Sequence, residues 1–446
     1  MDSHDKKLSF ERSAVAGGEE SGGKGGAAFQ ARYASRDVAA GLVTGTVAIP
    51  LTVGIAIMSD YPIQVGLATV VFASLIGWLF SWFRPGNYIG SPGIAAGLAP
   101  VLALGVASFG IENMAFCIFL TAIMQAIIWR FNWQRYLLVA VPIYLVEGLL
   151  AGVGLTIFLK FFSFTYAISD TAVSTAGFWD AARIQMLLIS VLTYVIFVAL
   201  VYRFRDTQPA IPYFVLIISG VIFALFVEVP MLHVEEVALR LAAPIPQVDN
   251  ILLLVYMVLF CAMLAVIDVI EQVMSNAAIE KIDPLERKCD SNNSLLAIWV
   301  ANLGASFFGG MTNLDGLAKS TTNKLAGAYT KFSILIVAIV VGLFTWQVQY
   351  LEYLPMFTLA VMMMFTGYKM IAGVLHVAHF GPYPMVLAIL CGGLVYQVGI
   401  FEGLLIAMAL HAIVHFVIYL NVGKMGTRQI LRRYIDRLKR DGGGVN

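Results

Sequence analysis

The stretch from Asn302 to Ser333, NLGASFFGGMTNLDGLAKSTTNKLAGAYTKFS, joins a glycine-rich break to a short predicted helix. Most of the remaining chain consists of apolar runs, and Lys319 falls in the first turns of that helix. A charged side chain at the centre of a bilayer costs roughly 2.5–3.5 kcal/mol on insertion scales, so it is rarely kept without a purpose. Broken backbone is tolerated at that depth only where it lines a cavity or is buried in protein. The stretch therefore predicts a site that holds an anion in the middle of a membrane.

The composition indicates an integral membrane protein built from α-helices. Of the 446 residues, 60% are hydrophobic and only 12% are charged. Apolar runs of about 20 residues, the length of one membrane crossing, recur from residue 37 to residue 420. The four cysteines lie far apart without zinc or disulfide spacing, so no metal is expected. The net charge of +1 gives no indication of a nucleic-acid partner.

Counting the apolar runs against their polar breaks predicts fourteen membrane segments. They are 37–58, 63–83, 91–107, 112–130, 138–161, 184–202, 210–228, 250–278, 293–309, 315–327, 330–349, 353–371, 384–396 and 398–421. The third and the tenth are too short to cross about 30 Å of hydrocarbon as helices.

The basic residues orient these segments. With fourteen segments, most of the 28 Lys and Arg residues fall on one side of the membrane, and the loops on the opposite side carry only Lys160, Arg183 and Arg240. This asymmetry is the positive-inside signature and requires an even number of crossings. We therefore expect a multi-pass protein of the cell (inner) membrane with both termini in the cytoplasm. Around a transmembrane domain over 36–421, residues 1–35 are expected to form a disordered cytoplasmic tail and residues 422–446 a basic cytoplasmic tail.

The two short segments are seven apart, and each follows an approach interrupted by glycine or proline. Paired interruptions in two halves indicate a 7+7 inverted repeat with a site at the midplane, here over about 36–228 and 250–421. The N-terminus of a half-helix presents unpaired N–H groups and about half a positive charge, which suits an anion. The residues expected at the two helix ends are Ser91, Gly93 and Ile94 on one side and Gly316, Leu317 and Ala318 on the other.

The stretch 302–333 resembles the sulfate permease (SulP) family of anion transporters. In that family a Gly-Gly-x-Pro break leads into a Gly-x-x-Arg-Thr-x-x-Asn helix, followed by Gly-Ala-x-Thr. The residues that match in register are Gly309, Gly310, Gly316, Asn323, Gly327, Ala328 and Thr330, with Lys319 at the basic position. A looser similarity extends from about residue 36 to residue 419 and includes the opening Asp37-Val-Ala-Ala-Gly-Leu with Pro50.

The resemblance implies a core domain that carries half-helices at spans three and ten, a gate domain that moves against it, and a homodimer. It implies that the substrate binds between the two half-helix N-termini and that Pro50 and Thr52 line the site. On the eighth span it implies that Glu271 and Ser275 hold the coupling ion or line the substrate site.

Three departures from the family pattern matter. The usual arginine is Lys319, which replaces a bidentate fork by a point charge. Asp315 stands where the family has a small residue and adds a negative charge to an electropositive site. The chain also ends about 25 residues after its last predicted span, so the cytoplasmic STAS domain of most members is not expected in it.

Two interpretations remain open for Lys319. Asp315 lies four residues before it, so the two could form an i, i+4 ion pair on one helix; alternatively Lys319 attracts the substrate. Of the acidic pair on the eighth span, Glu271 is expected to face the site and Asp268 to face another helix. Glu147 lies among small residues that favour close helix contact and is expected to pack there.

We therefore expect a secondary active transporter of a small inorganic or organic anion, similar to sulfate or bicarbonate, coupled to H⁺ or Na⁺. One alternative is a nucleobase/H⁺ symporter of the same fold, in which Glu271 and Asp315 would hydrogen-bond the ring; a passive anion channel is another. An enzyme is not expected, because none of the six histidines has a convincing set of catalytic partners.

Overall fold

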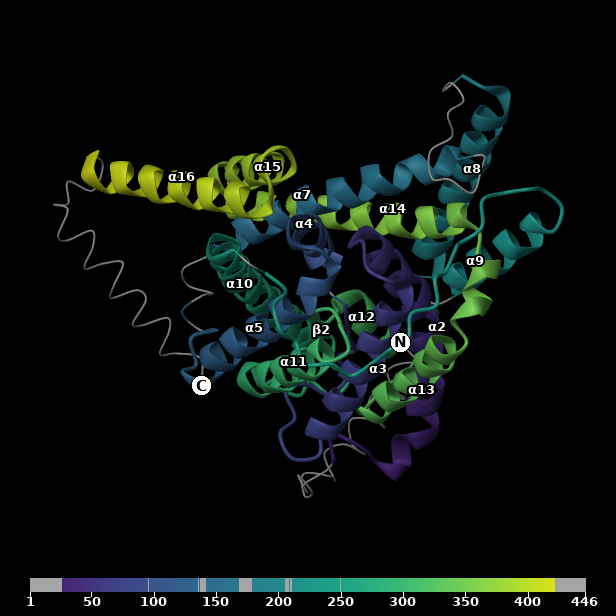
Figure 1. Cartoon of the computed structure of the whole chain (residues 1–446), viewed down its shortest axis with the longest axis horizontal. Helices are drawn as coiled ribbons and strands as arrows, with labels where there is room; N and C mark the ends of the chain where they lie inside the picture. The colour runs from purple at the N-terminus through teal and green to yellow at the C-terminus, as the bar shows by residue number, and fades with distance from the viewer. Residues whose placement is uncertain are drawn as a thin grey trace, which may run out of the picture.

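The computed structural model describes residues 26–94, 96–134, 136, 142–167, 179–204, 208, 211–248 and 250–421 (Figure 1). The predicted basic tail, 422–446, and the first 25 residues of the predicted N-terminal tail lie outside the described residues. The end of that N-terminal tail is packed rather than disordered. Ala27 and Ala28 are buried, and Ala27 O accepts a 2.9 Å hydrogen bond from the backbone N of Lys331.

The described chain is mostly helical. The α-helices are α2 (Ala34–Met58), α3 (Ile63–Phe80), α4 (Ala99–Phe109), α5 (Ile111–Arg130), α7 (Ile143–Phe162), α8 (Ala181–Phe204), α9 (Ile211–Ala224), α10 (Ile251–Ile282), α11 (Ser291–Ser306), α12 (Leu317–Leu325), α13 (Phe332–Trp346), α14 (Met356–Gly373), α15 (Pro382–Gln397) and α16 (Ile400–Asn421). Short 3₁₀ helices are η1 (Ala31–Tyr33), η2 (Ala96–Leu98), η3 (Ser163–Tyr166), η4 (Val348–Tyr353) and η5 (Val374–Phe380).

Among the described residues, 7 helical stretches are both long enough and apolar enough to cross a membrane. They are Ala31–Met58, Ile63–Phe80, Ile111–Arg130, Tyr144–Tyr166, Ala181–Phe204, Ile251–Ile282 and Met356–Phe380. Shorter apolar helices lie between them, so the chain has the helical content of a multi-pass membrane protein.

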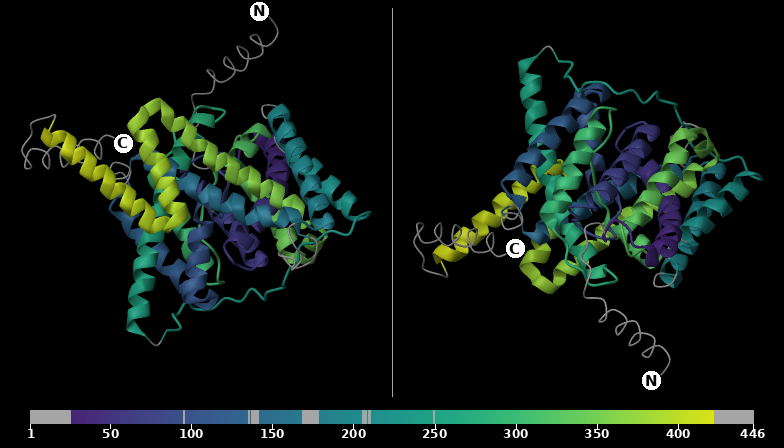
Figure 2. Two further views of the ribbon diagram at one scale, coloured as in Figure 1. Left: turned by 90° about the horizontal axis from the view of Figure 1, so that it is seen from above. Right: turned by 90° about the horizontal axis from the view of Figure 1, so that it is seen from below.

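The helices pack in two groups. In the first, α13 packs on α2 and α3, while α5 packs on α10 and α11. In the second, α7 packs on α14 and α15, and α15 packs on α16, with α8 and α9 at one end (Figure 1). The yellow-green helices α14, α15 and α16 lie nearest the viewer when the molecule is seen from above, and behind the first group when it is seen from below (Figure 2).

Glycines on α7 explain how the second group packs. A Cβ at Gly148 would lie 2.3 Å from the backbone O of Ala388, and one at Gly154 would lie 2.6 Å from the backbone O of Gly367. Small residues let helix backbones approach this closely, and in a membrane such packing is a main source of helix association. The expectation of close helix contact around Glu147 is therefore confirmed.

The chain is not entirely helical, which corrects the all-α prediction. Strand β1 (Pro92–Ile94) pairs antiparallel with β2 (Asn313–Asp315), so that Pro92 lies opposite Asp315 and Ile94 opposite Asn313. All six residues are buried. Each strand satisfies the backbone groups of the other in the protein interior, where water cannot do so.

Each strand leads into a short helix. Strand β1 continues into η2 and the 11-residue helix α4, whereas β2 continues into the 9-residue helix α12. Because the strands are antiparallel, these two helices leave the sheet in opposite directions.

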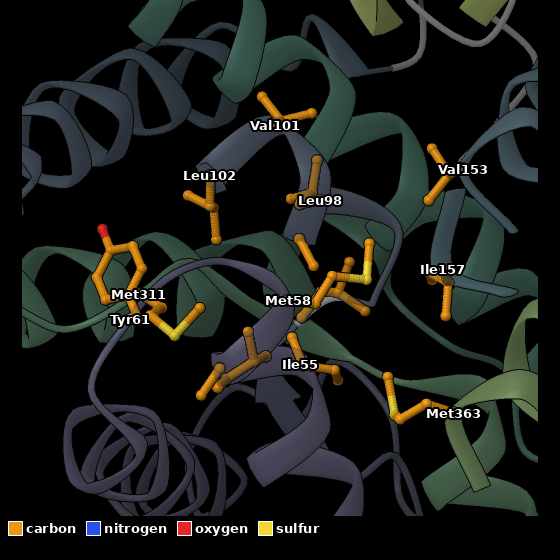
Figure 3. Packing of buried hydrophobic residues seen from close by; sticks show 14 of the residues in the cluster. Ile55, Met58, Tyr61, Leu98, Val101, Leu102, Val153, Ile157, Met311 and Met363 are labelled. Carbon is orange, nitrogen blue, oxygen red and sulfur yellow. The ribbon is translucent and has the colours of Figure 1, made fainter. Parts of the chain in front are cut away.

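The contact between the two helix groups is apolar. Figure 3 shows Leu98 and Leu102 beside Met58 of α2, with Ile157 of α7 and Met363 of α14 in the same cluster. All five side chains are almost completely buried. Beside this apolar cluster, Lys160 Nζ of α7 donates hydrogen bonds to the backbone O of Met58 (3.1 Å) and of Ile57 (3.4 Å) at the end of α2. The two groups are therefore joined by apolar packing and by these few hydrogen bonds.

Candidate functional site

Two glycines of the β1–η2 segment lie against charged side chains from other elements. A Cβ at Gly93 would lie 1.6 Å from Lys319 Nζ of α12. A Cβ at Gly97 would lie 2.7 Å and 2.9 Å from the two carboxylate oxygens of Glu271 of α10. Only a residue without a side chain leaves room for these groups. The sheet therefore brings the ammonium of Lys319 and the carboxylate of Glu271 to one short segment of backbone.

Lys319 is buried at the start of α12. Its side chain is almost inaccessible, and its Nζ donates a 3.3 Å hydrogen bond to the backbone O of Pro92. Among the described residues no carboxylate lies within ion-pair distance of it. The ammonium is thus held by one carbonyl and the glycine gap.

The N-terminus of α12 opens to accessible space. Leu317 is 43% exposed and Ala318 is also exposed, although both lie next to the buried Lys319. No side chain caps the helix, so its first N–H groups are available to a ligand. An accessible helix N-terminus beside a buried ammonium has the electrostatics of an anion site.

The polar surroundings of Asp315 overturn the ion pair considered for Lys319. Asp315 Oδ1 lies 3.6 Å from Lys331 Nζ, and both side chains are buried. Oδ2 accepts hydrogen bonds from Asn87 (2.7 Å), Gln272 (3.2 Å) and Ser294 (3.3 Å). The cation paired with Asp315 is therefore Lys331 and not Lys319.

Glu271 and Ser275, the two residues expected at the coupling-ion site, have different surroundings. Ser275 Oγ donates to the backbone O of Asp315, which ties α10 to β2. Glu271 is only partly buried, and no hydrogen bond to its carboxylate is seen among the described residues. The carboxylate of Glu271 is thus available to a ligand, whereas the hydroxyl of Ser275 is engaged in a hydrogen bond to strand β2.

Asp268 faces another helix, as expected. Its Oδ2 accepts a 2.6 Å hydrogen bond from Gln125 of α5 and a 3.3 Å hydrogen bond from Asn302 of α11. Asn302 Oδ1 in turn accepts from the backbone N and the Nδ2 of Asn313 in β2 (2.8 and 2.6 Å). These bonds fix the start of the strand to α11 and, through Asp268, to α10.

The remaining predicted residues are placed as follows. Ser91 N donates to Ser320 Oγ (3.0 Å), while Ser91 Oγ is buried without a hydrogen-bond partner in the described part of the chain. Ile94 is buried in the apolar cluster. Pro50 and Thr52 are buried in α2, and Thr52 packs against Gly66 of α3. A direct part for Pro50 and Thr52 in the site stays a prediction.

Sequence reasoning missed Asn87, Gln272, Ser294 and Lys331. Asn87 lies in the glycine- and proline-rich approach to β1, and a polar residue there was the one available signal. The positive-inside pattern places Lys331 on the cytoplasmic side, with most of the other basic residues. Only the fold shows that its side chain turns inward to Asp315 and to the backbone O of Gly90 (2.6 Å).

Comparisons with known proteins concern the family and the fold of the chain. A model of the Sulfate permease family matches residues 35–391. The putative sulfate transporter YvdB of Bacillus subtilis (strain 168) is 26% identical over an alignment of 348 residues, which covers 75% of this chain. The chain spans 64% of that relative's length.

Solved structures share the fold. The transmembrane domain of a cyanobacterium bicarbonate transporter, BicA, superposes with a TM-score of 0.66 at 18% identity, covering 85% of this chain and 98% of that one. Murine Solute Carrier 26 family member A9, an anion transporter in the inward-facing state, superposes with a TM-score of 0.69 at 16% identity, covering 87% and 69%. At such identities the likeness concerns the fold alone.

Proposed function

Because this chain belongs to the sulfate permease family, we propose that it is a secondary active transporter of a small anion of the sulfate or bicarbonate kind. It is a multi-pass membrane protein of a transporter family and not an enzyme. The substrate would bind between the start of α12 and the β1–η2 segment, with its charge offset by Lys319 and by the helix N-termini.

The observation that carries this proposal is the buried ammonium of Lys319, which forms no ion pair with any described residue. A buried cation without a counter-charge raises the free energy of the folded protein, and a bound anion lowers that free energy again. The exposed Leu317 and Ala318 provide access to the same helix end. This combination favours reversible binding of an anion at Lys319 and argues against a permanent ion pair there.

The proposed architecture has fourteen spans in a 7+7 inverted repeat, with repeats over about 36–228 and 250–421. The β1–α4 and β2–α12 segments would be the half-helices at spans three and ten. The first helix group, with these two segments, would form the core domain, and α7, α8, α9, α14, α15 and α16 the gate domain. Both termini would lie in the cytoplasm of a cell membrane protein, and two copies would form a homodimer.

Transport would require the core to move against the gate. The apolar contact between Leu98, Ile157 and Met363 can slide, which supports such a movement. The hydrogen bonds from Lys160 to the end of α2 would have to break during it. Glu271 would take up the coupling H⁺ or Na⁺, because its carboxylate is the acidic group that stays open beside the site.

Counterflow in liposomes across a panel of anions tests the proposal. We expect exchange of at least one of sulfate, bicarbonate, nitrate or formate. Lys319→Ala should reduce it roughly a hundredfold, the scale seen when one charged group is removed from a preorganised site. Lys324→Ala, a change on the last turn of the same helix, is the matched control and should keep most of the activity. Loss of exchange in both variants, or in neither, contradicts the role given to Lys319.

The alternatives are tested in the same liposomes. A nucleobase symporter would exchange labelled uracil, but it loses support because Asp315 already satisfies Lys331, Asn87 and Gln272. A passive channel would show anion flux that is independent of pH and sodium gradients, and Glu271→Gln would then leave the flux unchanged.

A further inference from the structure

Two opposite charges are buried together behind the proposed site. Asp315 ends β2, two residues before α12 begins, and Lys331 lies just before α13. Their side chains are 5% and 4% exposed, and Oδ1 and Nζ are 3.6 Å apart. A buried carboxylate that loses its cation becomes strongly destabilising or acts on the next charge within reach.

We infer that Lys331 is a specificity-determining residue of the transporter: by cancelling the charge of Asp315, it leaves Lys319 as the effective charge of the site. This inference rests on the proposed function. With the Glu271 carboxylate neutralised by the coupling ion, the site then carries one net positive side-chain charge next to the substrate, which matches a monovalent anion better than a divalent one.

The geometry explains why Asp315 does not pair with Lys319 instead. Asn87, Gln272 and Ser294 hold Oδ2 on the side of α10 and α11. Lys319 Nζ lies across the sheet, over Gly93 and beside Pro92 O. Asp315 is nevertheless close enough to act on the Lys319 ammonium through space. Its charge therefore matters to the site unless something cancels it.

Lys331 is held in place from several directions. Its backbone N donates to Ala27 O (2.9 Å), and the preceding Thr330 Oγ1 donates to Asp37 Oδ2 (2.6 Å). Arg287 Nη2 donates to the backbone O of Tyr329 (2.8 Å). The loop before α13 is thus fastened to α2 and to the loop after α10. A side chain supported in this way is built into the fold, not resting on it by chance.

The space around the pair has little room for water. A cavity of about 20 Å³, lined among others by Arg84, Asn87, Asp315 and Lys331, lies next to it. Such a volume holds about one water molecule. With so little solvent, the two charges are not screened from each other or from the site, so removing either one changes the field at Lys319.

Uptake by proteoliposomes of one divalent anion, sulfate, and one monovalent anion, nitrate, tests the inference in four proteins: wild type, Asp315→Asn, Lys331→Met and the double variant. Asp315→Asn adds one net positive charge and should lower the KM for sulfate relative to nitrate roughly tenfold. Lys331→Met should change this ratio in the opposite direction by a similar factor. The double variant removes both charges and should return the ratio to within about twofold of wild type.

The outcomes separate the inference from the proposed function. A KM ratio that is the same in all four folded proteins overturns the inference, because a merely structural pair changes the amount of active protein and not its choice of anion. If Lys331→Met fails to fold, the ratio in Asp315→Asn and its reversal in the double variant still decide. Wild-type protein that moves neither these anions nor bicarbonate or formate overturns the proposed function, and the inference with it.

Discussion

The β1–α4 and β2–α12 segments have the same order of elements and pair with each other, yet their chemistry differs. Helix α4, APVLALGVASF, is apolar and joins the buried contact with the other helix group. Helix α12, LAKSTTNKL, is polar and carries Lys319, and its strand ends in Asp315. One segment supplies space through its glycines and the other supplies charge. Two segments with the same order of elements therefore form the two unlike sides of the proposed site.

Substitution of the glycine beside Lys319 should have the largest effect. In Gly93→Ala the new Cβ would lie 1.6 Å from Nζ, so the ammonium must move away while the backbone can stay. We expect a folded protein whose anion exchange falls roughly a hundredfold, as for a positioned group displaced by about 1 Å. Exchange in liposomes measures this, and size-exclusion chromatography checks the fold.

The matched control for this change is Gly393→Ala in α15, where a Cβ would meet nothing within 4 Å. It should behave like wild type. Normal exchange by Gly93→Ala would mean that Lys319 does not need the space left by the missing side chain at Gly93. The division into one segment that supplies space and one that supplies charge would then be wrong.

Substitution of the second glycine tests the other end of the same segment. Gly97→Ala would press on both carboxylate oxygens of Glu271. We expect uptake to fall roughly tenfold and to lose its dependence on the H⁺ or Na⁺ gradient, as in Glu271→Gln, because Gly97→Ala displaces the carboxylate and Glu271→Gln replaces it by a neutral amide. Uptake measured with and without each gradient gives the answer. Intact gradient dependence in Gly97→Ala, together with its loss in Glu271→Gln, would separate Glu271 from this contact.

The support of the polar strand can be measured as stability. Asn302→Ala removes hydrogen bonds to Gln125 (2.9 Å), Asp268 and two nitrogens of Asn313, all buried. We expect a loss of about 2–4 kcal/mol, since buried partners are left unsatisfied. Thermal unfolding in detergent detects this as a lower Tm.

The comparison variant is Ser320→Ala, which removes the 3.0 Å hydrogen bond from Ser91 N and should cost about 1 kcal/mol. A larger loss in Ser320→Ala than in Asn302→Ala would show that the sheet depends more on its β1 side.

A prediction that leaves transport untouched concerns Cys289, in the loop between α10 and α11. Burial and the nearby Glu280 carboxylate raise the pKa of the Cys289 thiol to about 12, while Lys331 lowers that pKa and Asp315 raises it. At pH 8 the thiol therefore stays protonated, and its alkylation should be roughly a thousandfold slower than that of an ordinary cysteine. The rate should rise about tenfold with each pH unit above 8 and level off only near pH 12.

Cys289 also reports on the buried ion pair. Lys331→Met should raise its pKa further and slow alkylation, whereas Asp315→Asn should lower the pKa and speed alkylation. Maleimide labelling over a range of pH, with the other three cysteines replaced by serine, gives the rates. Equal rates in the two variants would contradict the placement of the pair beside the loop.

The error about Asp315 shows where sequence reasoning ends. Asp315 and Lys319 are four residues apart, and the i, i+4 rule would pair them on one helix. Asp315 instead ends a strand, and α12 begins only at Leu317, so the rule does not apply. The strand itself escaped prediction because three residues carry no periodicity. Its partner lies more than two hundred residues away in the chain.

From the sequence alone one can derive the membrane class, the broken segments, the buried lysine and the family, since hydrophobic run length, glycine content and charge at membrane depth are local properties. The tertiary structure alone decided what each buried charge contacts. Lys319 lies against Gly93, Glu271 lies against Gly97, and Asp315 is paired with Lys331. The physical reason is that the electrostatic energy of a charge in a medium of low dielectric depends mainly on its distance to the nearest opposite charge. That distance depends on how remote segments of the chain pack.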